Sequence, residues 1–216
     1  MKFWDLREAV ILDCETTGLN PIKDRIVSLA LHKIVVPKLD LRRGESLEIT
    51  AETQSYKFNP QMEISSEAEA IHGFSLEMLK DEPVFEEKSL KIRDFIGDAP
   101  IVAHNIEFDG GFLDAAFQRS GCRPLHDNER LCTMKEAQKR ASFFARRHVK
   151  YPKLMEAFEY SGIAAPFVQS TTHNAERDAS LVMGLTIGFA NCDIDYRERS
   201  LKFKKWTFKG WLFPKI

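Results

Sequence analysis

The sequence has little of what marks a secreted, disulfide-bonded or membrane protein. It contains only four cysteines, which are far apart in the chain: Cys14, Cys122, Cys132 and Cys192. Without a Cys-x-x-Cys pair, neither a disulfide framework nor a cysteine zinc site is expected. No stretch approaches the roughly 18 apolar residues of a membrane helix, and the charged segment from Met1 to Glu8 is unlike a signal peptide. We therefore expect a cytoplasmic protein without a membrane partner.

A large excess of one charge is also missing. Lysine and arginine number 31, aspartate and glutamate number 32, and the net charge is −1. The distribution is uneven, because Tyr196 to Ile216 hold seven basic residues against one acidic residue, a net charge of +6. The rest of the chain is therefore acidic, whereas proteins that grip duplex DNA through its phosphates are usually basic throughout. Such a body indicates either no polyanionic partner or a site where carboxylates hold cations.

What is present suits one soluble domain with an extension. The chain has 216 residues, of which 44% are hydrophobic and 29% charged, proportions typical of a globular rather than a disordered protein. One domain of about 150 residues or somewhat more accounts for most of this length. We expect a body domain in residues 1–191 and a separate tail, basic and rich in aromatic residues, in 192–216.

The apolar pattern changes along the chain. Runs of apolar residues predict strands over 9–13, 25–36, 47–58 and 100–104. Apolar residues at helical spacing predict helices over 83–97, 108–120, 154–162 and 175–190. Three strands followed by alternating helix and strand favour an α/β layer fold with a mixed sheet. The connection at 38–48 between the second and third strands is long and polar.

The first motif with chemical content lies at the end of the first predicted strand. Residues i and i+2 of a strand share a face, so Asp13 and Glu15 should be neighbours while Cys14 points into the core. Two carboxylates side by side repel each other, and a divalent cation is the usual compensation. A strand that simply runs into an acidic turn would give the same triplet, so this motif alone leaves both interpretations open.

Two further motifs lie at predicted helix starts. Asp109, four residues after Asn105, falls in the first turn of a helix, where the macrodipole favours an ionised carboxylate and where simple capping is also common. His173 precedes the last body helix, and Asp178 falls within its first two turns. A histidine there is often just a polar surface residue, but beside an activated water it has the pKa range of a general base.

Together, Asp-x-Glu on a strand, Asn-x-x-x-Asp at a strand-to-helix junction and His-x-x-x-x-Asp on a late helix resemble the DEDDh exonucleases. This DnaQ-like family includes the proofreading epsilon subunit of bacterial DNA polymerase III. The resemblance covers about Val10 to Phe189 and includes Ile71-His72-Gly73-Phe74 and the segment from Lys153 to Ile163. It implies an α/β fold with a ribonuclease H-like mixed five-stranded sheet flanked by helices. It also implies release of nucleoside 5′-monophosphates from 3′ ends.

The resemblance implies a role for each motif residue. Asp13 would bridge two divalent cations, Mg²⁺ or Mn²⁺, which suit oxygen ligands. Glu15 and Asp178 would hold the ion on the nucleophile side, and Asp109 would contribute to the other ion through water. His173 would take the proton of the attacking water.

The resemblance also implies a set of substrate-binding residues: Thr16, Gly18, Leu19, His72, Asn105 and Phe108. The backbone amides near Thr16 and Gly18 would meet the terminal sugar, and glycine allows a close approach. Leu19 would wedge against the terminal base. Phe108 is at helical spacing to Phe112, so a core role competes with its pocket role.

Two basic segments stay open in function. Residues 138–153 contain six basic residues, no acidic one and three aromatic ones: Lys139, Arg140, Arg146, Arg147, Lys150 and Lys153, with Phe143, Phe144 and Tyr151. They make either a solvated helix face with a loop or a strip that tracks the phosphates and bases of a single strand. The tail interleaves aromatic and basic residues, and its role in nucleic-acid contact, docking on the body or partner binding is undecided.

The sequence thus predicts a metal-dependent 3′→5′ exonuclease acting on single-stranded or frayed DNA ends, either alone or as a proofreading subunit of a DNA polymerase. A 3′→5′ exoribonuclease is the first alternative, because DNA and RNA are told apart by contacts to the 2′-OH. A catalytically idle nucleic-acid-binding scaffold is the second, and the presence of all five motif residues argues against it. Oligomeric state is not predicted.

Overall fold

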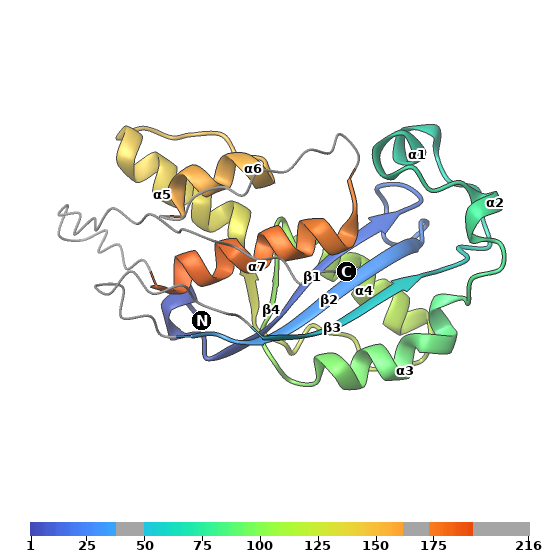
Figure 1. Cartoon of the computed structure of the whole chain (residues 1–216). Coiled ribbons are helices and arrows are strands. Elements are labelled where there is room, and N and C mark those ends of the chain that lie inside the picture. Colours follow the sequence, from blue (N-terminus) through green and yellow to red (C-terminus); the bar gives the residue numbers. More distant parts are fainter. Residues whose placement is uncertain (38–49, 162–172, 192–216) are drawn as a thin grey trace.

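The structure is a computed structural model that describes residues 1–37, 50–161 and 173–191 (Figure 1). The expected connection at 38–48 and the expected tail at 192–216 lie outside these ranges. The strands are β1 (Glu8–Thr16), β2 (Ile26–Val35), β3 (Ala51–Lys57), β4 (Ile101–Ala103) and β5 (Arg130–Cys132). The α-helices are α1 (Ser66–His72), α2 (Leu76–Leu79), α3 (Phe85–Ile96), α4 (Ile106–Arg119), α5 (Thr133–Ala145), α6 (Leu154–Ala157) and α7 (Ala175–Asn191). Two 3₁₀ turns, η1 (Phe3–Asp5) and η2 (Phe158–Tyr160), complete the described elements.

The five strands form one mixed sheet in the order β3-β2-β1-β4-β5. β1 pairs antiparallel with β2, which pairs antiparallel with β3, while β4 and β5 continue the sheet in parallel with β1. This confirms the predicted α/β class with a five-stranded mixed sheet flanked by helices. β1 is the central strand, so both of its faces are covered and its residues from Ala9 to Leu12 are fully buried.

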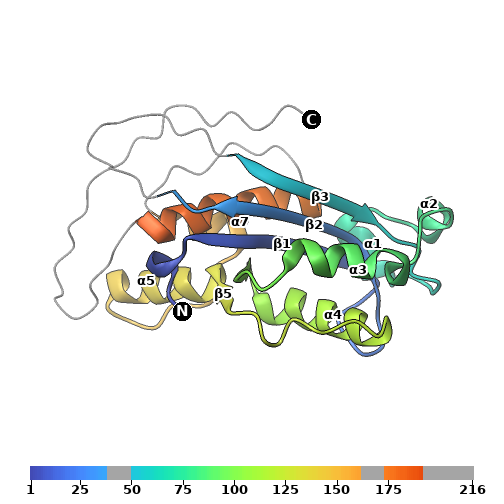
Figure 2. The same ribbon diagram turned by 90° about the horizontal axis from the view of Figure 1, so that it is seen from below.

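Helices cover both faces of the sheet, as Figures 1 and 2 show. On one face, α3 and α4 pack over a core to which β1 contributes Val10, Leu12 and Cys14. On the other face, α5, α6 and α7 pack over a second core that takes Ala9 and Ile11 from the same strand. The alternation of β1 thus supplies two cores from one strand.

The pattern of apolar residues predicted most elements but not all. β3 begins at Ala51, and the expected helix over 154–162 is the short α6 followed by η2, with residue 162 outside the described ranges. β5 and α5 were not assigned from the sequence. The three residues of β5 are too short for a strand pattern to stand out. Within the described residues, no helix is long and apolar enough to span a membrane.

Candidate active site

The Asp-x-Glu motif lies near the C-terminal end of β1, as predicted. Cys14 points into the core and is 6% exposed, so Asp13 and Glu15 point to the opposite face, toward the start of α7. Three alanines bring that helix close to the strands: Ala30, which pairs with Asp13, packs against Ala175 and Ala179 of α7. Small side chains at this contact allow the carboxylates of β1 and α7 to share one site.

Asp109 joins the same site from the first turn of α4. The ladder between β1 and β4 ends at the pair of Ile11 with Val102, so Cys14 has no strand partner on that edge among the described residues. Its backbone N–H donates instead to Oδ1 of Asp109, at 3.0 Å. Asp109 is 4% exposed and lies at the positive end of the helix, where an anion is stabilised.

The start of α7 carries the third motif. Asn174 caps this helix, because its side-chain oxygen accepts the backbone N–H groups of Glu176 at 3.0 Å and Arg177 at 3.2 Å. His173 lies just before the cap, and its backbone N–H donates to the carbonyl of Ile71 in α1. The capped helix start therefore fixes His173 and Asp178 relative to the sheet.

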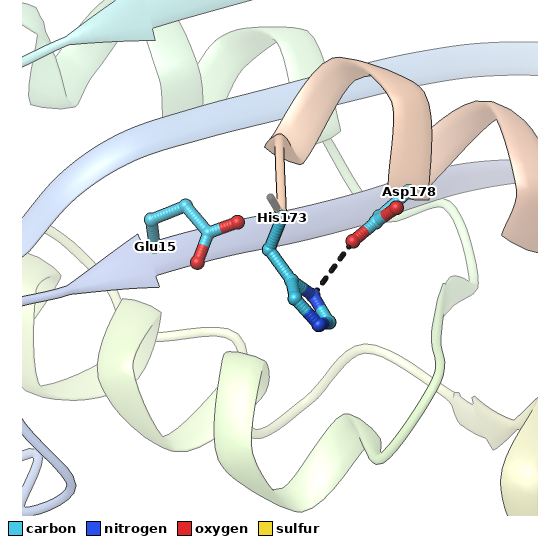
Figure 3. A group of neighbouring side chains, drawn as sticks. All are labelled: Glu15, His173 and Asp178. Atoms are coloured by element: carbon cyan, nitrogen blue, oxygen red, sulfur yellow. Dashed lines mark ion pairs between the residues drawn. The ribbon is translucent and has the colours of Figure 1, made fainter. Parts of the chain in front are cut away.

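Both oxygens of the Asp178 carboxylate have nitrogen partners. Nδ1 of His173 lies 2.9 Å from Oδ2 (Figure 3), and Nε and Nη2 of Arg177 each lie 2.8 Å from Oδ1. Asp178 is 5% exposed at its side chain, whereas His173 is 61% exposed. Ligand atoms of Glu15, His173 and Asp178 all lie within 4.8 Å of one another. A buried carboxylate is thus flanked by a histidine that remains open to solvent.

The carboxylates of the site repel one another, and burial together with this repulsion raises the pKa of Asp13 and Glu15. Desolvation, and then the charges of Asp109, Glu15 and Asp178, hold the pKa of Asp13 well above its ordinary value. Desolvation followed by the charges of Asp178 and Asp109 raises the pKa of Glu15 to about 8. Desolvation also raises the pKa of Asp109 to about 7, although its bonds to Cys14 act in the opposite direction. Carboxylates in this condition gain most from a neighbouring cation.

The donor set fits a hard divalent cation. Three of its four carboxylates are nearly inaccessible to solvent, with Glu15 8%, Asp109 4% and Asp178 3% exposed. Carboxylate oxygens without a thiolate among them suit Mg²⁺ or Mn²⁺ better than a soft metal. The structure therefore brings together all five residues that the sequence singled out, on β1, α4 and the start of α7.

The substrate-binding residues predicted near β1 form a small connected group. Phe74 donates its backbone N–H to Nδ1 of His72, so Nε2 of that ring carries the proton and donates to the carbonyl of Thr16 at 3.2 Å. The hydroxyl of Thr16 donates to the carbonyl of Gly18 at 2.7 Å. His72 is buried, so it contacts the turn after β1 from the interior of the protein. Leu19, which follows Gly18, is 83% exposed.

The structure shows a reason for glycine at position 18 that the sequence did not reveal. A Cβ at this position would lie 2.6 Å from Oδ2 of Asp24. That carboxylate accepts the backbone N–H of Asn20 at 2.8 Å and so closes the turn. A Cβ at this position would therefore displace the Asp24 carboxylate from its place in the loop.

The two predicted residues on α4 differ in their surroundings. Asn105 is the N-terminal cap residue with a left-handed backbone, at φ 82°, and makes no capping bond with its side chain. Phe108 is partly buried against the core, with its ring centroid 4.9 Å from that of Phe112. Phe108 accordingly has a core contact and an accessible part.

The basic segment 138–153 divides into a buried and an exposed part. Arg140 is 1% exposed at its side chain, pairs with Glu136 at 2.8 Å and lies 4.4 Å over the ring of Phe189. Including Arg140 in a strip for phosphates was therefore wrong, because this arginine holds α5 against α7. The exposed basic residues are Lys139, Arg146, Arg147, Lys150 and Lys153.

Two residues near the site, His104 and Arg177, were not singled out from the sequence. Nε2 of His104 lies 3.1 Å from the carbonyl of Pro152, and Nδ1 lies 3.0 Å from the hydroxyl of Thr133. Burial lowers the pKa of His104, so the neutral ring anchors the exposed basic loop beside α4. Arg177 is the second, and its position between His173 and Asp178 in the sequence was the available signal.

A family model described as exonuclease matches residues 10–186. The chain belongs to this exonuclease family. Over 123 residues it is 35% identical to a PolC-type DNA polymerase III from Staphylococcus haemolyticus, covering 56% of this chain and 8% of that protein. The corresponding protein of Halalkalibacterium halodurans is 34% identical over 115 residues, which is 53% of this chain and 7% of the relative. The chain thus spans less than a tenth of the length of these relatives.

Solved structures of E. coli exonuclease I share the fold. The complex with a dT13 oligonucleotide matches with a TM-score of 0.63 and 17% identity, over 83% of this chain and 40% of that one. A zinc-bound complex of the same enzyme with single-stranded DNA also has a TM-score of 0.63 and 17% identity, over 85% and 40% of the two chains. The predicted exonuclease family and ribonuclease H-like fold are both confirmed.

Proposed function

We propose that the described domain, with expected bounds of 1–191, is a metal-dependent exonuclease. It would hydrolyse phosphodiester bonds at the 3′ ends of single-stranded or frayed DNA and release nucleoside 5′-monophosphates. The observation that carries this proposal is the convergence of Asp13, Glu15, Asp109 and Asp178 from three elements, next to one solvent-open histidine, His173. A scaffold without activity would have no need to collect carboxylates that repel one another.

Asp13, Glu15, Asp109 and Asp178 would hold two divalent cations, Mg²⁺ or Mn²⁺, with Asp13 shared between them. Such ions supply charge for the leaving 3′-oxyanion and lower the pKa of the attacking water. Because desolvation raises the pKa of Glu15 to about 8 and of Asp109 to about 7, cation binding should release protons from these carboxyl groups. With the cations held, the acidic cluster would no longer repel the phosphate that is to be cleaved.

His173 would act as the general base. Its Nδ1 lies 2.9 Å from Oδ2 of Asp178, a contact that holds the ring and favours the tautomer with the proton on Nδ1. Nε2 is then free to accept a proton from water. The side chain is 61% exposed, so the proton can pass on to solvent afterwards.

The turn after β1 would bind the terminal nucleotide. The amides near Thr16 and Gly18 would face the sugar, the exposed Leu19 would lie against the terminal base, and His72 would hold the turn through the Thr16 carbonyl. Asn105 and Phe108 would line the opposite side, from the start of α4.

DNA is favoured as substrate by the nature of the relatives. The matching curated proteins include DNA polymerases of the PolC type, and the matching structures include a complex with dT13. Upstream of the site, the exposed Arg146, Arg147 and Lys150 would attract the backbone of a single strand. The same relatives are consistent with a role of this domain in proofreading by a DNA polymerase.

Labelled DNA and RNA oligonucleotides with either end blocked test the proposal. We expect mononucleotide release from DNA with a free 3′ end, none when that end is blocked, and none in EDTA. Preference for RNA would support the exoribonuclease alternative. Absence of both hydrolysis and Mg²⁺ binding would instead identify a scaffold.

A further inference from the structure

The guanidinium group of Arg177 lies within the acidic site and not in solvent. Its Nε donates to Oδ1 of Asp178 over 2.8 Å. Nη2 lies 2.8 Å from the same oxygen as part of the ion pair, and the side chain is 23% exposed. Nη1 is buried without a hydrogen-bond partner in the described part of the chain. A cation is thus already bound to a carboxylate that the proposed function assigns to a metal.

The number of lone pairs makes this contact restrictive. A carboxylate oxygen presents about two acceptor positions, and Oδ1 of Asp178 has both Nε and Nη2 of Arg177 at 2.8 Å, the first as a hydrogen bond and the second as an ion pair. The other oxygen, Oδ2, lies 2.9 Å from Nδ1 of His173. A metal ion could approach Oδ1 only if the guanidinium moved away, because two of its nitrogens lie 2.8 Å from that oxygen.

The charge of Arg177 also reaches β1. It lowers the pKa of Asp13 and of Glu15, opposing the larger effect of desolvation. Within the described residues it is the basic side chain that acts on both carboxylates. Arg177 therefore supplies part of the positive charge that this cluster needs.

The arginine can leave without a change of the backbone. Its backbone N–H is fixed by the Asn174 cap at 3.2 Å, so the start of α7 stays in place. Only the long side chain must turn away, and arginine has several rotatable bonds for this.

We propose that Arg177 is an internal counter-cation, which occupies Asp178 when no metal is bound and must release it for metal binding. This inference rests on the proposed metal-dependent function. Arg177 then has two opposite effects. It stabilises the metal-free fold by neutralising repulsion, and it lowers the affinity for the metal by competing for Asp178.

The test is metal affinity and thermal stability of Arg177→Met, which keeps an unbranched apolar side chain and removes the guanidinium group with its charge. Titration calorimetry with Mg²⁺ is done at about pH 8.5, because proton competition for carboxylates is weaker there. We expect Mg²⁺ to bind about tenfold more tightly, as coupled contacts of this kind are worth about that factor. In EDTA the variant should have a lower melting temperature than the wild type. Mg²⁺ should raise the melting temperature of the variant by more than it raises that of the wild type. Arg177→Lys should fall between the two.

Arg123→Met is the matched control. Arg123 also pairs with a carboxylate, Asp127, at 2.9 Å, but at an exposed position outside the site. Its loss should leave Mg²⁺ affinity unchanged. If Arg177→Met also binds Mg²⁺ like the wild type, or more weakly, the competition does not exist and the inference is overturned. If the wild type binds no Mg²⁺, the proposed function fails together with it.

Nuclear magnetic resonance of the wild type gives a readout that does not depend on folding of the variants. The Nε–H signal of Arg177 should exchange slowly with water in EDTA. Saturation with Mg²⁺ should move it into fast exchange, as for an exposed arginine. An unchanged signal at saturating Mg²⁺ would show that Arg177 stays on Asp178, and this would contradict the proposal.

Discussion

Asp109 accepts a hydrogen bond from the backbone of Cys14, and this single 3.0 Å contact joins residues 95 positions apart. It occurs where β1 runs beyond the end of β4 and would otherwise leave a buried N–H without a partner. Because Cys14 lies between Asp13 and Glu15, the same bond places the carboxylate of α4 beside those of β1. One contact thus completes the strand edge and assembles the acidic cluster.

Replacement of Asp109 should separate these two roles. Asp109→Ala leaves the Cys14 N–H buried and unpaired, so it should lower the free energy of unfolding by about 1–3 kcal/mol in EDTA. Asp109→Asn keeps an acceptor oxygen and should stay near the stability of the wild type, while both variants lose nuclease activity. Urea unfolding measures the difference. Equal stability of the two variants would show that the bond contributes nothing to the fold.

Asp13→Asn should abolish turnover without harming the fold. The wild type should be inactive in EDTA and recover with Mg²⁺ or Mn²⁺, whereas the variant should stay inactive with either metal, since the shared ligand is lost. Its melting temperature in EDTA should match or exceed that of the wild type, because removal of one charge relieves repulsion within the cluster. Activity of the wild type in chelator would rule out the metal mechanism.

His173→Asn should slow hydrolysis by about 10²–10⁴-fold, the usual loss when a general base is removed. Binding of Mg²⁺ and of oligonucleotide should change little, which calorimetry and fluorescence anisotropy can check. His126→Asn, at a position 65% exposed and outside the site, is the control. Wild-type turnover by His173→Asn would make this histidine an ordinary surface residue.

The metal-free protein should lose stability as the pH rises. Desolvation raises the pKa of Glu15 from its ordinary 4.5 to about 8, and that of Asp109 from 3.8 to about 7. Between these values the folded chain keeps protons that the unfolded chain has lost, so stability falls with increasing pH. This loss of stability is absent below the ordinary pKa values of the two carboxyl groups and complete above about pH 8.

Melting temperatures in EDTA between about pH 5 and 8 test this pH dependence. Glu15→Gln should flatten the curve, because an amide does not titrate, whereas Glu159→Gln at an exposed position should leave it unchanged. Added Mg²⁺ should oppose the loss at high pH, where the ligands are ionised. Superimposable curves for Glu15→Gln and the wild type would contradict the assigned cause.

The exposed and buried arginines of the basic segment should behave differently. Replacing both Arg146 and Arg147 by alanine should weaken binding of long single strands and reduce the slope of log K against log salt by about 1.4. Very short substrates and the melting temperature should be unaffected. Arg140→Met, in contrast, should lower the melting temperature, since it removes the buried pair with Glu136. A similar loss of stability in both variants would argue against a surface role for Arg146 and Arg147.

The sequence by itself determined what depends on local spacing. The period of two along β1 placed Asp13 and Glu15 on one face and Cys14 in the core, as the structure has them. The position of Asp109 in the first turn of its helix and of Asp178 within the first two turns was equally local, as was the helical pattern of α3, α4 and α7. These features follow from backbone geometry that neighbouring residues share.

Only the tertiary structure decided which distant groups meet. The sequence could not reveal that Arg140 is buried against Phe189, that Gly18 makes room for Asp24, or that Arg177 turns into the acidic site. A basic residue has the same letter in solvent and in an ion pair, and its side chain is long enough for either. Its surroundings depend on packing between elements far apart in the chain, and such packing leaves no periodic signal in the sequence.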